Sequence, residues 1–135
     1  MLGLSALFPP APKWNIDQVP DLTGRIAIVT GGNSGIGYET VRVLLSKNAK
    51  VYMAARSEER AQHAITDLAK LQLPGQVEWM LLDLASLESI KKFAGEYLTK
   101  VQRVDMLFDS AGLMTPVVGQ TTQRGYCLIY TAPSP

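Results

Sequence analysis

Hydrophobic and polar positions follow two alternating periods along most of the chain. Short apolar runs rich in β-branched residues predict strands that are buried on both faces of a parallel sheet. Longer stretches between them place apolar residues at helical spacing. The apolar runs fall at residues 25–30, 50–55, 76–83 and 104–108. Strands that alternate with helices in this way predict an α/β domain with right-handed crossovers.

Polar residues at the ends of the helical stretches predict where the helices begin and end. Lys47 and Asn48 suit a helix C-terminus, because a cation and an Asn are common there. Ser57 and Ser86 are predicted N-caps of the second and third helices. The predicted helices cover about residues 36–48, 57–71 and 86–102.

Four glycines lie where the first predicted strand gives way to the first helix, in the segment TGGNSGIG at residues 30–37, and three of them, Gly31, Gly35 and Gly37, have the spacing G-x-x-x-G-x-G. The first helical amides lack intrahelical partners and the helix dipole is positive there, which suits a pyrophosphate. Gly31 is expected to permit the tight turn, whereas a Cβ at Gly35 or Gly37 is expected to intrude on phosphate or strand. No Gly-Lys-Ser/Thr follows, which disfavours a P-loop kinase; a purely structural turn is the alternative.

Four motifs together resemble the short-chain dehydrogenase/reductase family, and within it retinol dehydrogenases and their fungal relatives. They are TGGNSGIG, Ala54-Ala55-Arg56, Leu82-Asp83-Leu84 and Asp109-Ser110-Ala111-Gly112, each after one predicted strand. The resemblance covers about residues 20–126 and implies a doubly wound sheet of strand order 3-2-1-4-5-6. Because only four strands are expected here, the predicted fold is α/β, a truncated Rossmann-type parallel sheet.

The resemblance also divides the chain into three parts. We expect an amino-terminal arm at residues 1–22, an NAD(P)-binding Rossmann half-domain at residues 23–115 and a divergent tail at residues 116–135. The likeness to the family ends after Tyr126. A shifted reading frame or retained intron is one hypothesis for the tail, and a genuine short tail is the other.

The resemblance assigns cofactor contacts position by position. It implies that the glycine turn lines the pyrophosphate and adenosine ribose, and that Asp83 accepts a hydrogen bond from the adenine amino group beside the Leu84 backbone. Asp109 stands where the family usually has Asn, and an acid cannot supply the amide donor, which puts an ordering role there in doubt. The expected cofactor-binding residues are Gly31, Asn33, Ser34, Gly35, Ile36, Gly37, Arg56, Asp83, Leu84, Asp109, Ala111 and Gly112.

Arg56 indicates which cofactor to expect. An NAD site generally needs an acidic residue near this strand end to hold the ribose hydroxyls, and here there is a guanidinium. Its fork of donors suits a 2′-phosphate, and a charge-assisted hydrogen bond is worth about 1.5 to 3 kcal/mol. NADP is therefore expected over NAD by roughly ten- to a hundred-fold. The alternatives are a solvated arginine or an ion pair with Glu59.

The chain lacks the family's catalytic pair. Hydride transfer in the family uses an upstream Ser, a Tyr and a Lys four residues after it, and no tyrosine here is followed by such a lysine. Without that charge, a tyrosine with a pKa of about 10 is a poor proton donor or acceptor at neutral pH. We assign no catalytic residue. Two functions stay open: an NADP-dependent oxidoreductase for lipophilic carbonyl or alcohol substrates, truncated before its catalytic residues, and a non-catalytic NADP-binding fragment.

Composition and charge argue against several other classes. The chain has 135 residues, 47% of them hydrophobic, and a net charge of +1, as in one ordinary globular domain. The sequence has neither a basic patch nor an alternation of basic and aromatic residues, so nucleic-acid binding is not expected. Cys127 is a lone cysteine and His63 is expected on a solvated helix face, so no disulfide or metal site is expected.

The two ends of the predicted domain raise separate expectations. The apolar stretch at residues 2–8 is too short to span a membrane and makes a poor signal peptide, so the cytoplasm is the default location. We expect Trp14 and Ile16 to attach the arm to the domain, with weak peripheral membrane contact as the alternative.

The fourth predicted strand is expected to be an open edge of the sheet. Ile28, Leu107 and Phe108 would then lack part of their cover. Marginal stability or aggregation follows from that expectation.

Overall fold

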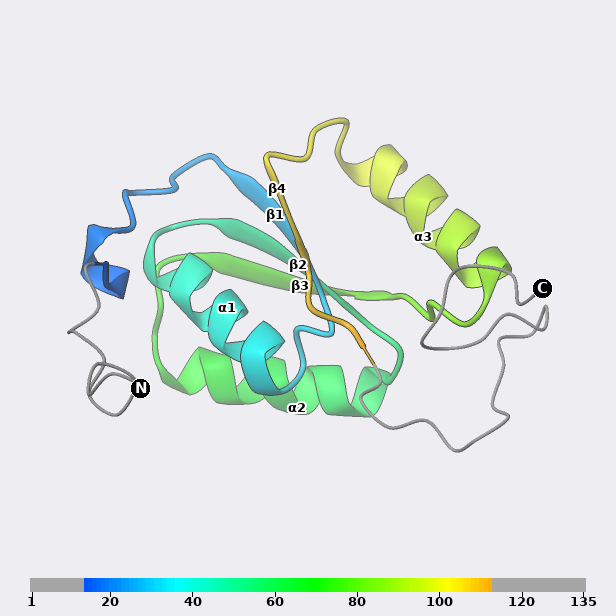
Figure 1. Cartoon of the computed structure of the whole chain (residues 1–135), viewed down its shortest axis with the longest axis horizontal. Coiled ribbons are helices and arrows are strands. Elements are labelled where there is room, and N and C mark those ends of the chain that lie inside the picture. Colours follow the sequence, from blue (N-terminus) through cyan, green and yellow to red (C-terminus); the bar gives the residue numbers. More distant parts are fainter. Residues whose placement is uncertain (1–13, 113–135) are drawn as a thin grey trace, which may run out of the picture.

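A computed structural model describes residues 14–112, and within them four parallel strands lie between helices (Figure 1). The elements are η2 (Ile16–Gln18), β1 (Ile26–Thr30), α1 (Gly35–Ser46), β2 (Lys50–Ala55), α2 (Glu58–Lys70), β3 (Gln76–Leu81), α3 (Leu87–Lys100) and β4 (Met106–Asp109). The strand order is β3-β2-β1-β4. This confirms the predicted α/β class and the first four strands of a Rossmann-type sheet.

The predicted helix caps are confirmed. The Ser57 hydroxyl accepts a hydrogen bond from the Arg60 amide at 3.4 Å, and the Ser86 hydroxyl accepts one from the Ser89 amide at 3.3 Å. Asn48 has a φ of 67°, a left-handed conformation that Asn tolerates better than most residues. It turns the chain from the end of α1 into β2.

Three strands differ from their predicted bounds, β1 only in beginning one residue later, at Ile26. β3 ends at Leu81 rather than at Asp83, because the Asp83 amide donates to Ser89 Oγ at 2.9 Å and the Asp83 carboxylate accepts from the Ala85 amide at 2.9 Å. These bonds turn the chain toward α3. β4 begins at Met106, two residues later than the apolar pattern predicts.

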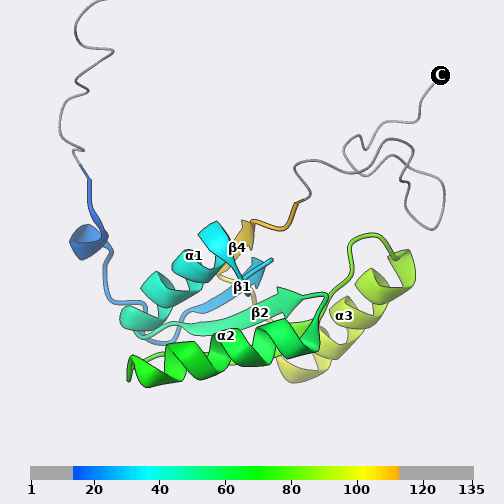
Figure 2. The same cartoon turned by 90° about the horizontal axis from the view of Figure 1, so that it is seen from below.

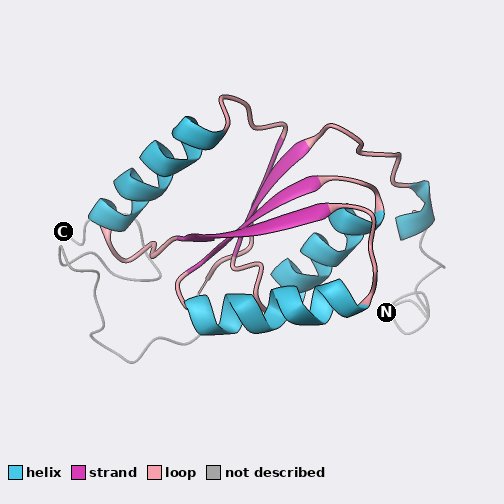
Figure 3. Cartoon of the chain, turned by 180° about the vertical axis from the view of Figure 1, so that it is seen from behind, coloured by secondary structure: helices cyan, strands magenta, loops and turns pink. Residues whose placement is uncertain are grey.

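The helices cover opposite faces of the sheet, α1 and α2 on one face and α3 on the other (Figures 1 and 2). Side chains of successive strand residues enter two separate cores. On β2, Val51 and Met53 pack with α1 and α2, whereas Tyr52 packs with Tyr97 of α3. The Tyr52 and Tyr97 rings meet edge to face, with centroids 5.1 Å apart. The view from behind shows the twisted strands between these helices (Figure 3).

The apolar side chains of β1 and β4 are buried to different extents. Leu107 is 64% exposed and Phe108 is partly buried, but Ile28 is only 6% exposed. The expectation that Ile28 lacks cover is wrong, because this central-strand residue belongs to the core that Tyr97 of α3 completes. The expectation is confirmed for Leu107. Among residues 14–112, β4 pairs with β1 only.

The described part of the arm is attached mainly through Leu22. The Leu22 amide donates to the Lys47 carbonyl at 2.7 Å, and its side chain packs against the core under α1. Trp14 and Ile16 are 61% and 45% exposed, so they contribute less to this attachment than expected. The predicted tail at residues 116–135 lies outside the described residues. None of the helices in the described part is long and apolar enough to cross a membrane.

Candidate cofactor-binding site

The predicted cofactor residues meet at the carboxyl ends of the four strands. Gly31 follows β1, Arg56 follows β2, Asp83 lies just beyond β3 and Ala111 lies just beyond β4. Because all four strands are parallel, these turns lie at the same end of the sheet. In such sheets ligands bind at this end, where the strand order reverses, and here that point lies between β1 and β4.

The backbone geometry of the glycine turn accounts for glycine at each of its three key positions. Gly31 has a φ of 64°, and a Cβ there would come within 3.0 Å of Ala111 Cα. A Cβ at Gly37 would clash with the Gly31 carbonyl, so α1 can approach β1 only without one. At Gly35 a Cβ would meet no protein atom within 4 Å, so its expected intrusion on a bound phosphate stays a prediction. The φ of 54° at Gly35 by itself favours glycine.

The start of α1 offers uncommitted donors. Within residues 14–112, the amides of Gly35, Ile36 and Gly37 have no hydrogen-bond acceptor, and the Ser34 side chain does not cap the helix. Ser34, Gly35 and Ile36 are exposed, with Asn33 partly buried beside them. Free amides at the positive end of a 12-residue helix, next to open space, fit a phosphate group.

Arg56 is exposed in the two-residue turn between β2 and α2. No ion pair joins it to Glu59 or to any other residue in the described part of the chain. The alternative of a pair with Glu59 is therefore wrong. The guanidinium is free to bind an anion at this end of the sheet.

Asp83 is partly buried in the turn after β3, and only one of its carboxylate oxygens is engaged. Oδ1 accepts the Ala85 amide, while Ser89 Oγ holds the Asp83 amide from the first turn of α3. Among the described residues Oδ2 has no hydrogen-bond partner, so it can accept a donor such as an amino group. Leu84 is 48% exposed beside it.

A hydroxyl that the sequence analysis did not single out links the ends of β1 and β4. Thr30 is 5% exposed; its Oγ1 donates to Asp109 Oδ1 at 3.0 Å and accepts the Ala111 amide at 3.0 Å. Asp109 therefore orders this turn as an acceptor, although it cannot donate. The available signal was a threonine at the end of an apolar strand, because a buried hydroxyl needs partners.

Comparison with known proteins identifies the family of the chain. The model of the family described as short chain dehydrogenase matches residues 25–125. The chain belongs to this family. A short-chain dehydrogenase/reductase of Armillaria gallica is 48% identical over 125 residues, which are 93% of this chain and 40% of the relative. The expected likeness to fungal members is thus confirmed.

Solved structures of short-chain dehydrogenases share the fold. A metagenomic short-chain oxidoreductase in complex with NADP is 32% identical with a TM-score of 0.63, covering 69% of this chain and 41% of that chain. Menthone neomenthol reductase from Mentha piperita is 36% identical with a TM-score of 0.61, covering 66% and 32%. The chain thus spans less than half of the length of these relatives.

The three tyrosines in the described part of this short-chain dehydrogenase sequence serve packing. The Tyr97 hydroxyl donates to the Arg103 carbonyl at 2.7 Å, and burial raises the pKa of its phenol. Tyr52 is 1% exposed within the core. Tyr38 is partly buried on α1. None has a lysine four residues later, so none matches the family's proton donor.

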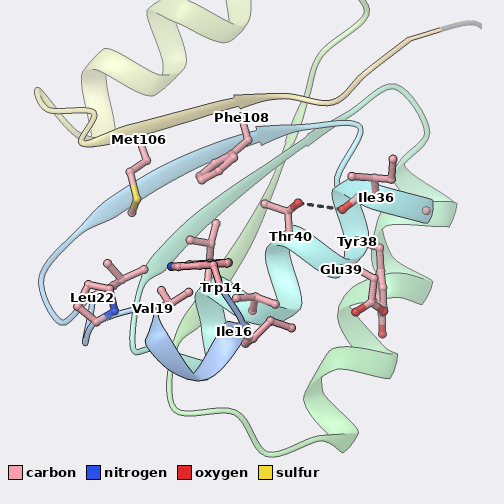
Figure 4. A pocket seen from close by; sticks show the side chains of 14 residues that line it. Trp14, Ile16, Val19, Leu22, Ile36, Tyr38, Glu39, Thr40, Met106 and Phe108 are labelled. Carbon is pink, nitrogen blue, oxygen red and sulfur yellow. Dashed lines mark hydrogen bonds between the residues drawn. The ribbon is translucent and has the colours of Figure 1, made fainter. Parts of the chain in front are cut away.

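An apolar groove of about 960 Å³ runs beside α1, between the arm and β4 (Figure 4). Trp14 and Ile16 line it from the arm, and Met106 and Phe108 line it from β4. Gly35 and Ile36 of the glycine turn line one end of the groove. The groove shares these two residues with the candidate cofactor site and otherwise lies beside it.

Proposed function

We propose that this part of the chain binds NADP and that the whole protein is an NADP-dependent oxidoreductase of carbonyl or alcohol groups on small lipophilic molecules. Exposed, unpaired Arg56 beside the phosphate turn carries the proposal, since the described residues offer no carboxylate in its place. A solved relative in complex with NADP supports it.

Each turn at the carboxyl end of the sheet would have one task. The amides at the start of α1 would bind the pyrophosphate, with Ser34 and Asn33 beside the ribose. Arg56 would donate to the 2′-phosphate, and Asp83 would accept from the adenine amino group. Thr30 and Asp109 would hold the Ala111 and Gly112 backbone near the nicotinamide half. When bound, the cofactor supplies or accepts the hydride.

The test of this assignment is the ratio of the dissociation constants for NADH and NADPH, measured by calorimetry on the full chain. We expect NADPH to bind roughly ten- to a hundred-fold more tightly, because the 2′-phosphate gains charge-assisted hydrogen bonds. Arg56→Ala should bring the ratio close to one. Lys91→Ala, which removes the same charge from α3, is the matched control and should leave it unchanged. An Arg56→Ala protein that keeps the full preference would refute the role of Arg56, and a wild-type ratio close to one would refute NADP specificity.

A second function, a non-catalytic NADP-binding fragment, is favoured by the packing roles of Tyr52 and Tyr97. Turnover separates the two functions. NADPH oxidation with a panel of aldehydes and ketones supports the oxidoreductase. A rise in melting temperature with NADPH, without turnover by the full chain, supports the fragment.

A further inference from the structure

Trp79 of β3 makes a side-chain hydrogen bond next to Arg56. Its indole Nε1 donates to the Ala55 carbonyl at 3.2 Å. The Leu82 amide donates to the same oxygen, also at 3.2 Å. The last carbonyl of β2 is therefore held by two donors, one from the backbone and one from a side chain.

This carbonyl belongs to the peptide unit that joins Ala55 to Arg56. A peptide unit is planar, so fixing its oxygen also fixes the direction in which the Arg56 backbone leaves β2. On the other side of Arg56, Ser57 is already tied to α2 as its N-cap. Only the side chain of Arg56 then keeps its freedom, which lowers the entropy lost when it binds an anion.

The Trp79 ring itself is well anchored. It is partly buried against the core formed with α1 and α2, beside Met53 on the neighbouring strand. Packing alone would be served by any large apolar ring. The N–H donor adds the link to the turn that carries Arg56.

We propose that Trp79 is a positioning residue for cofactor discrimination, holding the β2–α2 turn so that Arg56 meets the 2′-phosphate. This inference rests on the proposed NADP specificity. It assigns to a residue of β3, outside the four motifs, a part of the preference for NADPH over NADH.

Trp79→Phe tests the donor, because phenylalanine keeps an apolar ring and lacks the N–H. We expect the ratio of NADH to NADPH dissociation constants to fall about two- to tenfold, the effect of one net hydrogen bond. Trp14→Phe changes the other tryptophan of the chain, an exposed residue of the arm, and is expected to leave the ratio unchanged. In an Arg56→Ala background, Trp79→Phe should have no further effect on the ratio.

The outcomes separate the two proposals. If Arg56→Ala lowers the ratio but Trp79→Phe leaves it at the wild-type value, the positioning role is overturned and NADP specificity stands. If Arg56→Ala leaves the preference intact, Arg56 does not carry it and the positioning role is overturned as well. If the wild-type protein shows no preference for NADPH over NADH, NADP specificity itself fails.

A measurement on the wild-type protein covers the case in which Trp79→Phe does not fold. The Trp79 indole proton should exchange with solvent much more slowly than that of exposed Trp14, as followed by NMR in deuterated buffer. Equal exchange rates would overturn the proposal, because the indole would then not hold the carbonyl.

Discussion

Ile28 on β1 and Leu107 on β4 are register partners, yet one is 6% exposed and the other 64%. Both are large aliphatic residues on neighbouring parallel strands. Ile28 belongs to the core that includes Tyr52 and Tyr97, whereas Leu107 lies on a strand that pairs on one side only among the described residues. Apolar sequence thus predicts a strand, but the layers around that strand decide whether its side chains are buried.

The turns after β1 and β4 also differ in the interactions that fix their conformation. The turn after β1 is fixed by close backbone packing of Gly37 against Gly31, deep between α1 and the sheet. The turn after β4 is fixed by the Thr30 hydroxyl, through Asp109 and Ala111. The turn after β1 is thus held by backbone packing, and the β4 end depends on a few hydrogen bonds.

The largest expected effect tests the two register partners directly. Ile28→Ala should lower the free energy of unfolding by about 2 to 5 kcal/mol, because it leaves a cavity in a closed core. Leu107→Ala, the matched variant on the same face, should cost no more than about 0.5 kcal/mol. Urea denaturation of the full chain measures both. Equal costs would show that Leu107 is covered in solution and would break the comparison.

A smaller effect on stability is expected at the glycine turn. Gly37→Ala should lower the free energy of unfolding by about 1 to 3 kcal/mol, because the new Cβ pushes α1 away from the Gly31 carbonyl. It should also weaken NADPH binding, which calorimetry would detect. Gly95→Ala in α3 is the control: its Cβ meets nothing within 4 Å, so a gain of about 0.5 to 1 kcal/mol is expected. A neutral Gly37→Ala would argue against the close helix–strand approach.

The smallest effect concerns Asp105, which joins the starts of β1 and β4. The Ile26 amide donates to its Oδ2 at 2.8 Å and Arg25 donates to its Oδ1 at 3.1 Å, and together they hold the pKa of the carboxyl below its ordinary value. The stabilisation is therefore present above the unfolded-state pKa of about 3.9 and is lost as the pH falls through the lower folded-state value.

Asp105→Asn checks this sign. The difference in free energy of unfolding between wild type and variant should be constant above about pH 5 and shrink below about pH 4, as urea titrations at each pH would show. A difference that is the same at pH 3 and pH 7 would mean that the ionised carboxylate does not stabilise the junction of β1 with β4.

Local sequence determined most of the elements and the glycine turn of this short-chain dehydrogenase family member. Apolar runs placed the strands, and Ser57 and Ser86 marked helix starts, because strand burial and N-capping act over a few neighbouring residues. The φ values of Gly31 and Gly35 likewise follow from requirements of the turn itself. These features could be predicted without knowing what lies across the sheet.

Only the tertiary structure decided which residues far apart in the sequence contact one another. The bond from Trp79 to the Ala55 carbonyl, the bridge from Thr30 to Asp109 and the burial of Ile28 all depend on strand order and register. Each involves residues more than 20 positions apart, and the short periods of the sequence pattern carry no information about such pairs. The sequence therefore named the candidate cofactor residues, and the packing of β3 and β4 against their neighbours determined which other side chains hold them in place.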